Sequence, residues 1–203
     1  MGYEMRRYCI CMLMCVAFLS VGCSYRHRME HAIEKFKSEK VTIPFHEMTC
    51  WVNDTLQDER PWEQAEMKMV VYIDSTQCSG CMLRKLFMWE DFIKMEKEYD
   101  GRFYIFFILQ SPPGARDADI AAKFYMTEIN HPIYIDSRSA LARQNHHLPN
   151  ETACHTFLLD KDGYVKLIGD PLYHIRTENQ LRHLVREALT PEPSGNPEDN
   201  DSV

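Results

Sequence analysis

The chain has 203 residues, of which 30 are acidic and 23 basic, so its formal net charge is −7. This acidic balance argues against nucleic acid as a partner, because nucleic acids are bound by basic surfaces. The length fits a single domain with short extensions.

The first 22 residues predict a signal peptide. Two arginines precede a continuous apolar run, Tyr8–Val21, which is too short to span a bilayer and is typical of a secretory signal. The run ends in S-V-G-C at Cys23, which is similar to the lipobox of bacterial lipoproteins, although Ser20 stands where leucine is usual. We therefore expect lipidation of Cys23 to anchor the protein to a membrane of the bacterial cell envelope, facing the periplasm. An ordinary cleaved signal or an uncleaved anchor is the alternative.

Residues 23–66 are expected to form a lipid-anchored tether and an N-terminal extension. Apolar spacing predicts a helix at Met29–Lys40, a short extended piece at Val41–Pro44, a strand at Glu47–Val52 and a loop at Asn53–Gln64. At the other end, residues 191–203 are rich in proline and acidic residues and predict a disordered acidic tail.

Residues 67–190 carry stronger signals, in which strands alternate with helices. Compact apolar runs predict buried strands at Lys68–Ile73 and Arg102–Gln110, and a short strand at Pro132–Asp136. Helices are expected at Met82–Tyr99, Asp117–Ile129, Ser137–His146 and Thr177–Leu189. A turn at Asp160-Lys161-Asp162-Gly163 joins Thr156–Asp160 and Tyr164–Ile168 in a hairpin. This order predicts an α/β domain with a central mixed sheet, flanking helices and a C-terminal β-hairpin plus helix.

Four cysteines remain once the signal peptide is removed and Cys23 is assigned to lipidation: Cys50, Cys78, Cys81 and Cys154. Disulfides persist in an oxidising compartment, but the sequence does not choose among the three possible pairings. Cys78 and Cys81 form a Cys-x-x-Cys motif between a predicted strand and the next helix, a position typical of thioredoxin-like redox sites. The dipole and free N–H groups of a helix N-terminus favour a thiolate at Cys78.

Three motifs give residues 68–189 a resemblance to the thioredoxin-like superfamily: VVYIDSTQCSGC, HPIYIDSRSALARQ and HTFLLDKDGYVKLIG. Within it, the chain is most similar to extracytoplasmic thiol–disulfide oxidoreductases of the TlpA and ResA kind. The resemblance implies a thioredoxin-like three-layer fold without a cofactor, acting on protein thiols and disulfides of the cell envelope. In this interpretation Cys78 attacks and Cys81 resolves the mixed disulfide, and reduction or isomerisation is expected rather than oxidation.

Three positions depart from that family pattern. Gln77 stands where a tryptophan often precedes the first cysteine, and Tyr72 stands where thioredoxin buries an acidic residue. Cys154 stands where the fold has a cis-proline that packs against the dithiol. A cis bond before a non-proline residue costs about 2.5–4 kcal/mol, so we expect the Ala153–Cys154 bond to be trans and this loop to be reshaped.

Cys154 has two interpretations, a third redox thiol or a small packed apolar residue. The alternative to an enzyme is a non-catalytic module that binds a protein partner or a soft metal, copper or zinc, through Cys78, Cys81 and Cys154 or His155. Cys154 and His155 are neighbours on an expected extended segment, so their side chains should diverge. Cys50 is expected to be a packed thiol or part of a structural disulfide.

Overall fold

The computed structural model describes residues 25–74, 86–126 and 129–190. The signal peptide, the lipidation residue Cys23, the dithiol of Cys78 and Cys81, and the acidic tail lie outside the described residues. In the part of the chain that is described, no helix is both long and apolar enough to cross a membrane.

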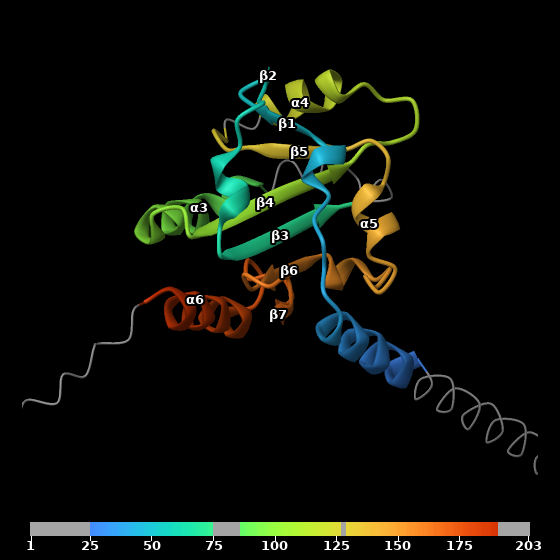
Figure 1. The fold of residues 1–203 in the computed structure, drawn as a ribbon, viewed down its shortest axis with the longest axis vertical. Helices are drawn as coiled ribbons and strands as arrows, with labels where there is room; N and C mark the ends of the chain where they lie inside the picture. The colour runs from blue at the N-terminus through green and yellow to red at the C-terminus, as the bar shows by residue number, and fades with distance from the viewer. Residues whose placement is uncertain (1–24, 75–85, 127–128, 191–203) are drawn as a thin grey trace, which may run out of the picture.

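A seven-stranded mixed sheet forms the centre of the molecule, in the order β2-β1-β5-β4-β3-β6-β7 (Figure 1). The strands are β1 (Thr49–Val52), β2 (Thr55–Leu56), β3 (Met67–Ile73), β4 (Phe103–Gln110), β5 (Ile133–Asp136), β6 (Thr156–Leu159) and β7 (Val165–Ile168). The three central strands β3, β4 and β5 are parallel, whereas β6 is antiparallel to β3 and β7 to β6. Parallel strands joined through helices and a closing antiparallel hairpin confirm the order predicted from the sequence.

Strands β3 and β4 are buried at nearly every position, because helices cover both faces of the sheet. The helices are α3 (Glu90–Glu96), α4 (Asp117–Tyr125), α5 (Ala140–Gln144), α6 (Ile175–Leu189) and an N-terminal helix at residues 25–38. Side chains of α3, α4 and α6 pack on one face of the sheet, where Phe92, Phe124 and Leu181 are buried. The N-terminal helix and α5 cover the other face through Phe36 and Leu141. The predicted three-layer, thioredoxin-like α/β fold is thereby confirmed.

The N-terminal extension is part of the sheet. The strand expected at Glu47–Val52 is confirmed as β1, which pairs antiparallel with β5. Asn53 and Asp54 then form a tight turn with φ of 48° and 62°, and the chain returns as β2. The prediction of a loop at Asn53–Gln64 is therefore wrong at its start, where a small hairpin lies.

The helix expected at Met82–Tyr99 is helical throughout its described part, residues 86–99, and residues 82–85 lie outside the described residues. Its described part consists of a 3₁₀ turn at Leu86–Trp89, helix α3 and a second 3₁₀ turn at Lys97–Tyr99. It ends at Tyr99 and is followed by Asp100, with a φ of 51°, and Gly101, with a φ of 77°, and left-handed residues of this kind terminate helices.

Candidate functional site

Two segments that are far apart in the sequence meet at the carboxyl end of β3. Asp74 follows β3 directly and is the last described residue before the segment that carries the dithiol. Cys154 and His155 precede β6, which runs antiparallel to β3, and the amide of Tyr72 donates a 2.8 Å hydrogen bond to the carbonyl of His155. The structure therefore brings both candidates to the strand end that leads into the dithiol segment.

Cys154 is a free thiol with only 3% of its surface exposed. It ends a 3₁₀ turn at Thr152–Cys154, where its amide donates to the carbonyl of Glu151 at 2.8 Å. Burial raises the pKa of the Cys154 thiol, and the Glu151 carboxylate raises it further. The described residues contain no cis peptide bond, so the Ala153–Cys154 bond is trans as expected. These properties favour a packed thiol over a third redox group.

His155 is also buried, with 5% of its surface exposed. Its φ of −83° and ψ of −1° are helical rather than extended. The extended conformation that was expected for Cys154 and His155 is therefore wrong. The Nε2 atom lies 3.0 Å from the carbonyl oxygen of Pro149. The Nδ1 atom lies 3.2 Å from Oδ2 of Asp74, but without the alignment of a hydrogen bond. The two ring nitrogens thus face a carbonyl and a carboxylate.

Tyr72 lies next to His155, and its hydroxyl is bound by the side-chain amide of Gln110. Its ring meets that of His155 edge-on with 5.2 Å between centroids, and its hydroxyl donates to Oε1 of Gln110 at 3.1 Å. The amide nitrogen of Gln110 in turn donates to Oγ of Ser139 at 2.6 Å. Burial raises the pKa of Tyr72, and the carboxylates of Asp136 and Asp74 raise it further. Tyr72 is therefore a neutral phenol at physiological pH.

An open pocket of about 400 Å³ borders these side chains. Tyr72, Asp74 and Gln110 line it from the ends of β3 and β4, and His155 lines it from the segment before β6. The carboxyl ends of β3 and β4 point toward α5 (Figure 1), and Pro149, from the loop after α5, also lines the pocket. Groups at this end of the sheet are thus accessible to a small molecule or a peptide side chain. The contact of Asp74 with His155 was not predicted from the sequence. A polar residue at the end of a buried strand was the available signal.

The metal alternative involves four residues, of which the structure describes two, Cys154 and His155. Within the described residues there is no group of three or more His, Cys, Asp or Glu side chains that could hold a metal ion. Both ring nitrogens of His155 already face protein oxygen atoms. The other two residues of that alternative, Cys78 and Cys81, lie outside the described residues.

Cys50 is a fully buried free thiol in β1, opposite Tyr134 of β5. Burial raises its pKa to about 11. Strands β5, β4 and β3 lie between β1 and β6 in the sheet, which separates Cys50 from the Cys154 segment by about 19 Å. A disulfide requires Cα atoms within about 7 Å, so these two cysteines cannot form one. Of the two expectations for Cys50, a packed thiol or part of a structural disulfide, the packed thiol is confirmed.

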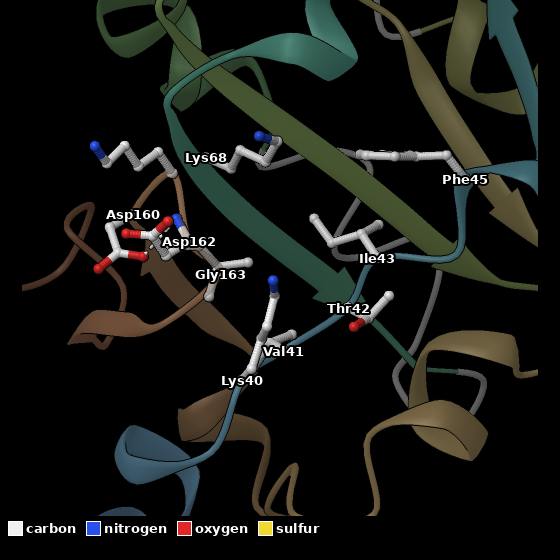
Figure 2. Close-up of a pocket in the computed structure, with 11 residues that line it drawn as sticks. Lys40, Val41, Thr42, Ile43, Phe45, Lys68, Asp160, Asp162 and Gly163 are labelled. Carbon is white, nitrogen blue, oxygen red and sulfur yellow. Dashed lines mark hydrogen bonds between the residues drawn. The ribbon is translucent and has the colours of Figure 1, made fainter.

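A second pocket, of about 270 Å³, is lined by Lys68 near the start of β3 (Figure 2). The segment from Lys40 to Phe45 and the hairpin turn at residues 160–163 line it, together with Lys68. The amine of Lys68 donates to the carbonyl of Ala65, and burial lowers the pKa of this lysine. This pocket is the junction between the N-terminal segment and the closing hairpin.

No protein-family model and no curated protein matches the chain. Among solved structures, the chain is similar to a candidate protein disulfide isomerase from Bacteroides thetaiotaomicron, with 18% identity, coverage of 74% of this chain and 92% of that one, and a TM-score of 0.48. It is also similar to a candidate thiol:disulfide interchange protein DsbE from Chlorobium tepidum, with 17% identity, coverage of 60% and 81%, and a TM-score of 0.43. Both TM-scores lie below 0.5, so the fold class rests on the strand order and connections of the chain itself.

Proposed function

We propose that the chain is a thiol–disulfide oxidoreductase that acts on protein disulfides through Cys78 and Cys81. The observation that carries the proposal is the position of the Cys-x-x-Cys motif, which begins four residues after Asp74 at the end of the central strand β3. The buried segment of Cys154 and His155 packs against the same strand end. An open pocket gives a substrate access to this region.

The chemistry needs no cofactor. The Cys78 thiolate attacks one sulfur of a substrate disulfide, forms a mixed disulfide and releases one substrate thiolate. The Cys81 sulfur then attacks Sγ of Cys78 and releases the second substrate thiolate. The substrate gains two electrons and two protons, and the dithiol becomes a Cys78–Cys81 disulfide. Run in reverse, the same steps oxidise a substrate, and a partial cycle isomerises one; we propose reduction or isomerisation.

The proposed place of action is the bacterial cell envelope. Lipidation of Cys23, two residues before the described N-terminal helix, would tether the domain to a membrane surface facing the periplasm. The proposed partners are thiols and disulfides of other envelope proteins, in a compartment where such bonds persist.

Disulfide reduction by single-cysteine variants of the full chain tests the proposal. We expect Cys78→Ser to abolish reduction of an insulin disulfide, because it removes the attacking sulfur. Cys81→Ser should instead accumulate mixed disulfides with substrate, since the resolving sulfur is missing. The matched controls Cys50→Ala and Cys154→Ala remove buried thiols of raised pKa and should retain reduction.

Two outcomes would contradict the enzyme. One is a Cys78→Ser variant that reduces insulin as fast as the unaltered chain. The other is copper or zinc that co-purifies stoichiometrically and is lost in Cys81→Ser, which would establish the non-catalytic, metal-binding alternative.

A further inference from the structure

We propose that the pocket between the N-terminal segment and the closing hairpin binds a small organic carboxylate, whose head contacts the amines of Lys40 and Lys68 and whose hydrocarbon body contacts the apolar lining. This pocket is separate from the one that Asp74 and His155 line, so the ligand site is independent of thiol–disulfide exchange. Its volume is about 270 Å³. An apolar cavity of about 150 Å³ already admits benzene, so the space suits a ligand of about 6–10 non-hydrogen atoms.

Lys68 is a half-buried ammonium group without a counter-charge. Its amine donates to the carbonyl of Ala65, and among the described residues it forms no ion pair with a carboxylate. Burial lowers the pKa of this lysine, and no carboxylate in the described part of the chain offsets that effect. An ammonium group has three N–H donors, so two remain for a ligand. A bound carboxylate would supply the missing charge and accept charge-assisted hydrogen bonds.

Lys40 supplies the second amine, and the hairpin turn holds its side chain in place. A Cβ added at Gly163 would lie 3.2 Å from both Cγ and Cε of Lys40, so the lysine stem lies along the backbone of this glycine. The amide of the next residue, Val41, donates to the carbonyl of Gly163 at 2.8 Å. Figure 2 shows the Lys40 side chain extending from the 40–45 segment into the space between the hairpin turn and Ile43. Two amines from different segments thus line one pocket.

Four apolar side chains form much of the remaining lining. Val41 and Leu159 are buried, and Ile43 and Phe45 are partly buried against the same core cluster. The ring of Phe45 is held by the ring of Phe106, with 5.1 Å between their centroids. An ordered apolar wall beside two amines favours a ligand with a hydrocarbon body over a bare inorganic anion.

Two aspartates of the hairpin turn also line the pocket, but the turn itself uses one of them. Oδ1 of Asp160 accepts hydrogen bonds from the amides of Asp162 and Tyr164, at 3.0 and 2.9 Å. Asp162 is exposed, and the neighbouring Lys161 adds a third ammonium group to the lining. The pocket therefore holds an excess of positive charge, which favours an anion.

Binding of hexanoate to the full chain at about pH 7 tests the inference. The NMR shifts of the Val41 and Ile43 amides follow the titration, and we expect them to saturate. Hexanol lacks the carboxylate and should bind at least about 10-fold more weakly, because it forms no charge-assisted hydrogen bond. Acetate lacks the hydrocarbon body and should also bind at least about 10-fold more weakly, because it buries less apolar surface.

Three lysine variants locate the site. Lys68→Met keeps most of the apolar stem and should weaken hexanoate binding by at least about 10-fold, because it removes the half-buried charge. Lys40→Met should weaken binding by about 3-fold, since water screens this exposed amine more strongly. Lys37→Met is the matched control, because Lys37 is exposed on the same helix and lies outside the lining. It should leave binding unchanged.

Acetylation of the unaltered chain by acetic anhydride gives a second measurement that depends on no variant. Saturating hexanoate should slow acetylation of Lys68 at least about 5-fold, because a bound carboxylate covers the amine and favours its protonated form. Acetylation of Lys37 should not change. Shifts that do not saturate, binding that Lys68→Met does not weaken, or acetylation of Lys68 that hexanoate does not slow would each overturn the inference. Hexanol or acetate that binds as tightly as hexanoate would overturn it too.

Discussion

At the scale of single residues, the buried pair of Glu96 and His131 joins three parts of the fold. The Glu96 carboxylate accepts a 2.7 Å hydrogen bond from the amide of Ile105 in β4 and lies 3.0 Å from Nε2 of His131. Nδ1 of His131 lies 3.0 Å from the carbonyl of Pro132 and therefore donates to it. Helix α3 is thus tied both to β4 and to the chain that enters β5.

Replacing Glu96 should show how much this link stabilises the fold. We expect Glu96→Ala to lower the free energy of unfolding by about 3–5 kcal/mol, because it leaves His131 and the Ile105 amide buried without a partner. Glu96→Gln should cost about 1 kcal/mol or less, because its oxygen can accept from Ile105 while its nitrogen donates to neutral Nε2. Urea unfolding measures both. The exposed Glu98→Ala is the control and should stay within about 0.5 kcal/mol of the unaltered chain. Equal costs for the alanine and glutamine variants would contradict this account.

At the scale of elements, the hydrophobic pattern of the sequence predicted the buried strands. It did not predict the strand β2, which is defined by its pairing with β1. Strands β3 and β4 are long apolar runs, and the turn before Tyr164 has its own chemical signature, so these elements were predicted from sequence. Strand β2 has two exposed residues and shows no alternation that could reveal it. Its turn at Asn53 and Asp54 is of a kind that hairpins use, but the flanking strands are too short for the pattern to be recognised.

In the candidate site, too, the features set by local sequence were predicted, and those set by contacts between distant segments were not. The dithiol was predicted from two cysteines at fixed spacing beside a predicted strand, which is local information. The contact between Asp74 and His155 forms only because β6 pairs with β3, which brings together residues that are 81 positions apart. The backbone turn at Cys154 likewise depends on packing against the rest of the fold, and the sequence around it suggested an extended segment.

A substitution of Gly163 would test the contact between the hairpin turn and the N-terminal segment at residues 40–45. Its φ is +89°, its carbonyl accepts a 2.8 Å hydrogen bond from the amide of Val41, and an added Cβ would lie 2.8 Å from the carbonyl oxygen of Val41 (Figure 2). Gly163→Ala should therefore combine backbone strain with displacement of the 40–45 segment. Gly101→Ala is the matched control, because Gly101 has a φ of +77° but no atom within 4 Å of an added Cβ.

We expect Gly101→Ala to cost about 1 kcal/mol of unfolding free energy and Gly163→Ala at least about 1 kcal/mol more. Hydrogen exchange at the Val41 amide should also become faster in Gly163→Ala alone. Equal costs and unchanged exchange would show that the N-terminal segment is not held by this contact.

At the scale of the whole molecule, burial of neutral thiols and phenols links stability to alkaline pH. Burial raises the pKa of Cys50 to about 11, and it also raises the pKa values of Cys154, Tyr72, Tyr104 and Tyr134. In the unfolded chain these groups release their protons at ordinary values, near 9 for the thiols and near 10 for the phenols. Between the ordinary and the raised values the folded chain holds more protons, so its stability falls as the pH rises. The lowered pKa of Lys68 acts in the opposite direction, but it is a single group.

The free energy of unfolding should accordingly fall above about pH 9. Cys50 contributes stability that is complete below about 9 and is lost as the pH rises through about 11. Its shift of about two pH units corresponds to about 2–3 kcal/mol, so Cys50→Ala should make the decline between these pH values shallower by about that amount. Tyr125→Phe alters an exposed ring and should leave the decline as it is. Denaturant unfolding at a series of pH values measures all three proteins, and a decline that is equally steep in Cys50→Ala would show that burial of this thiol does not set the alkaline limit of the fold.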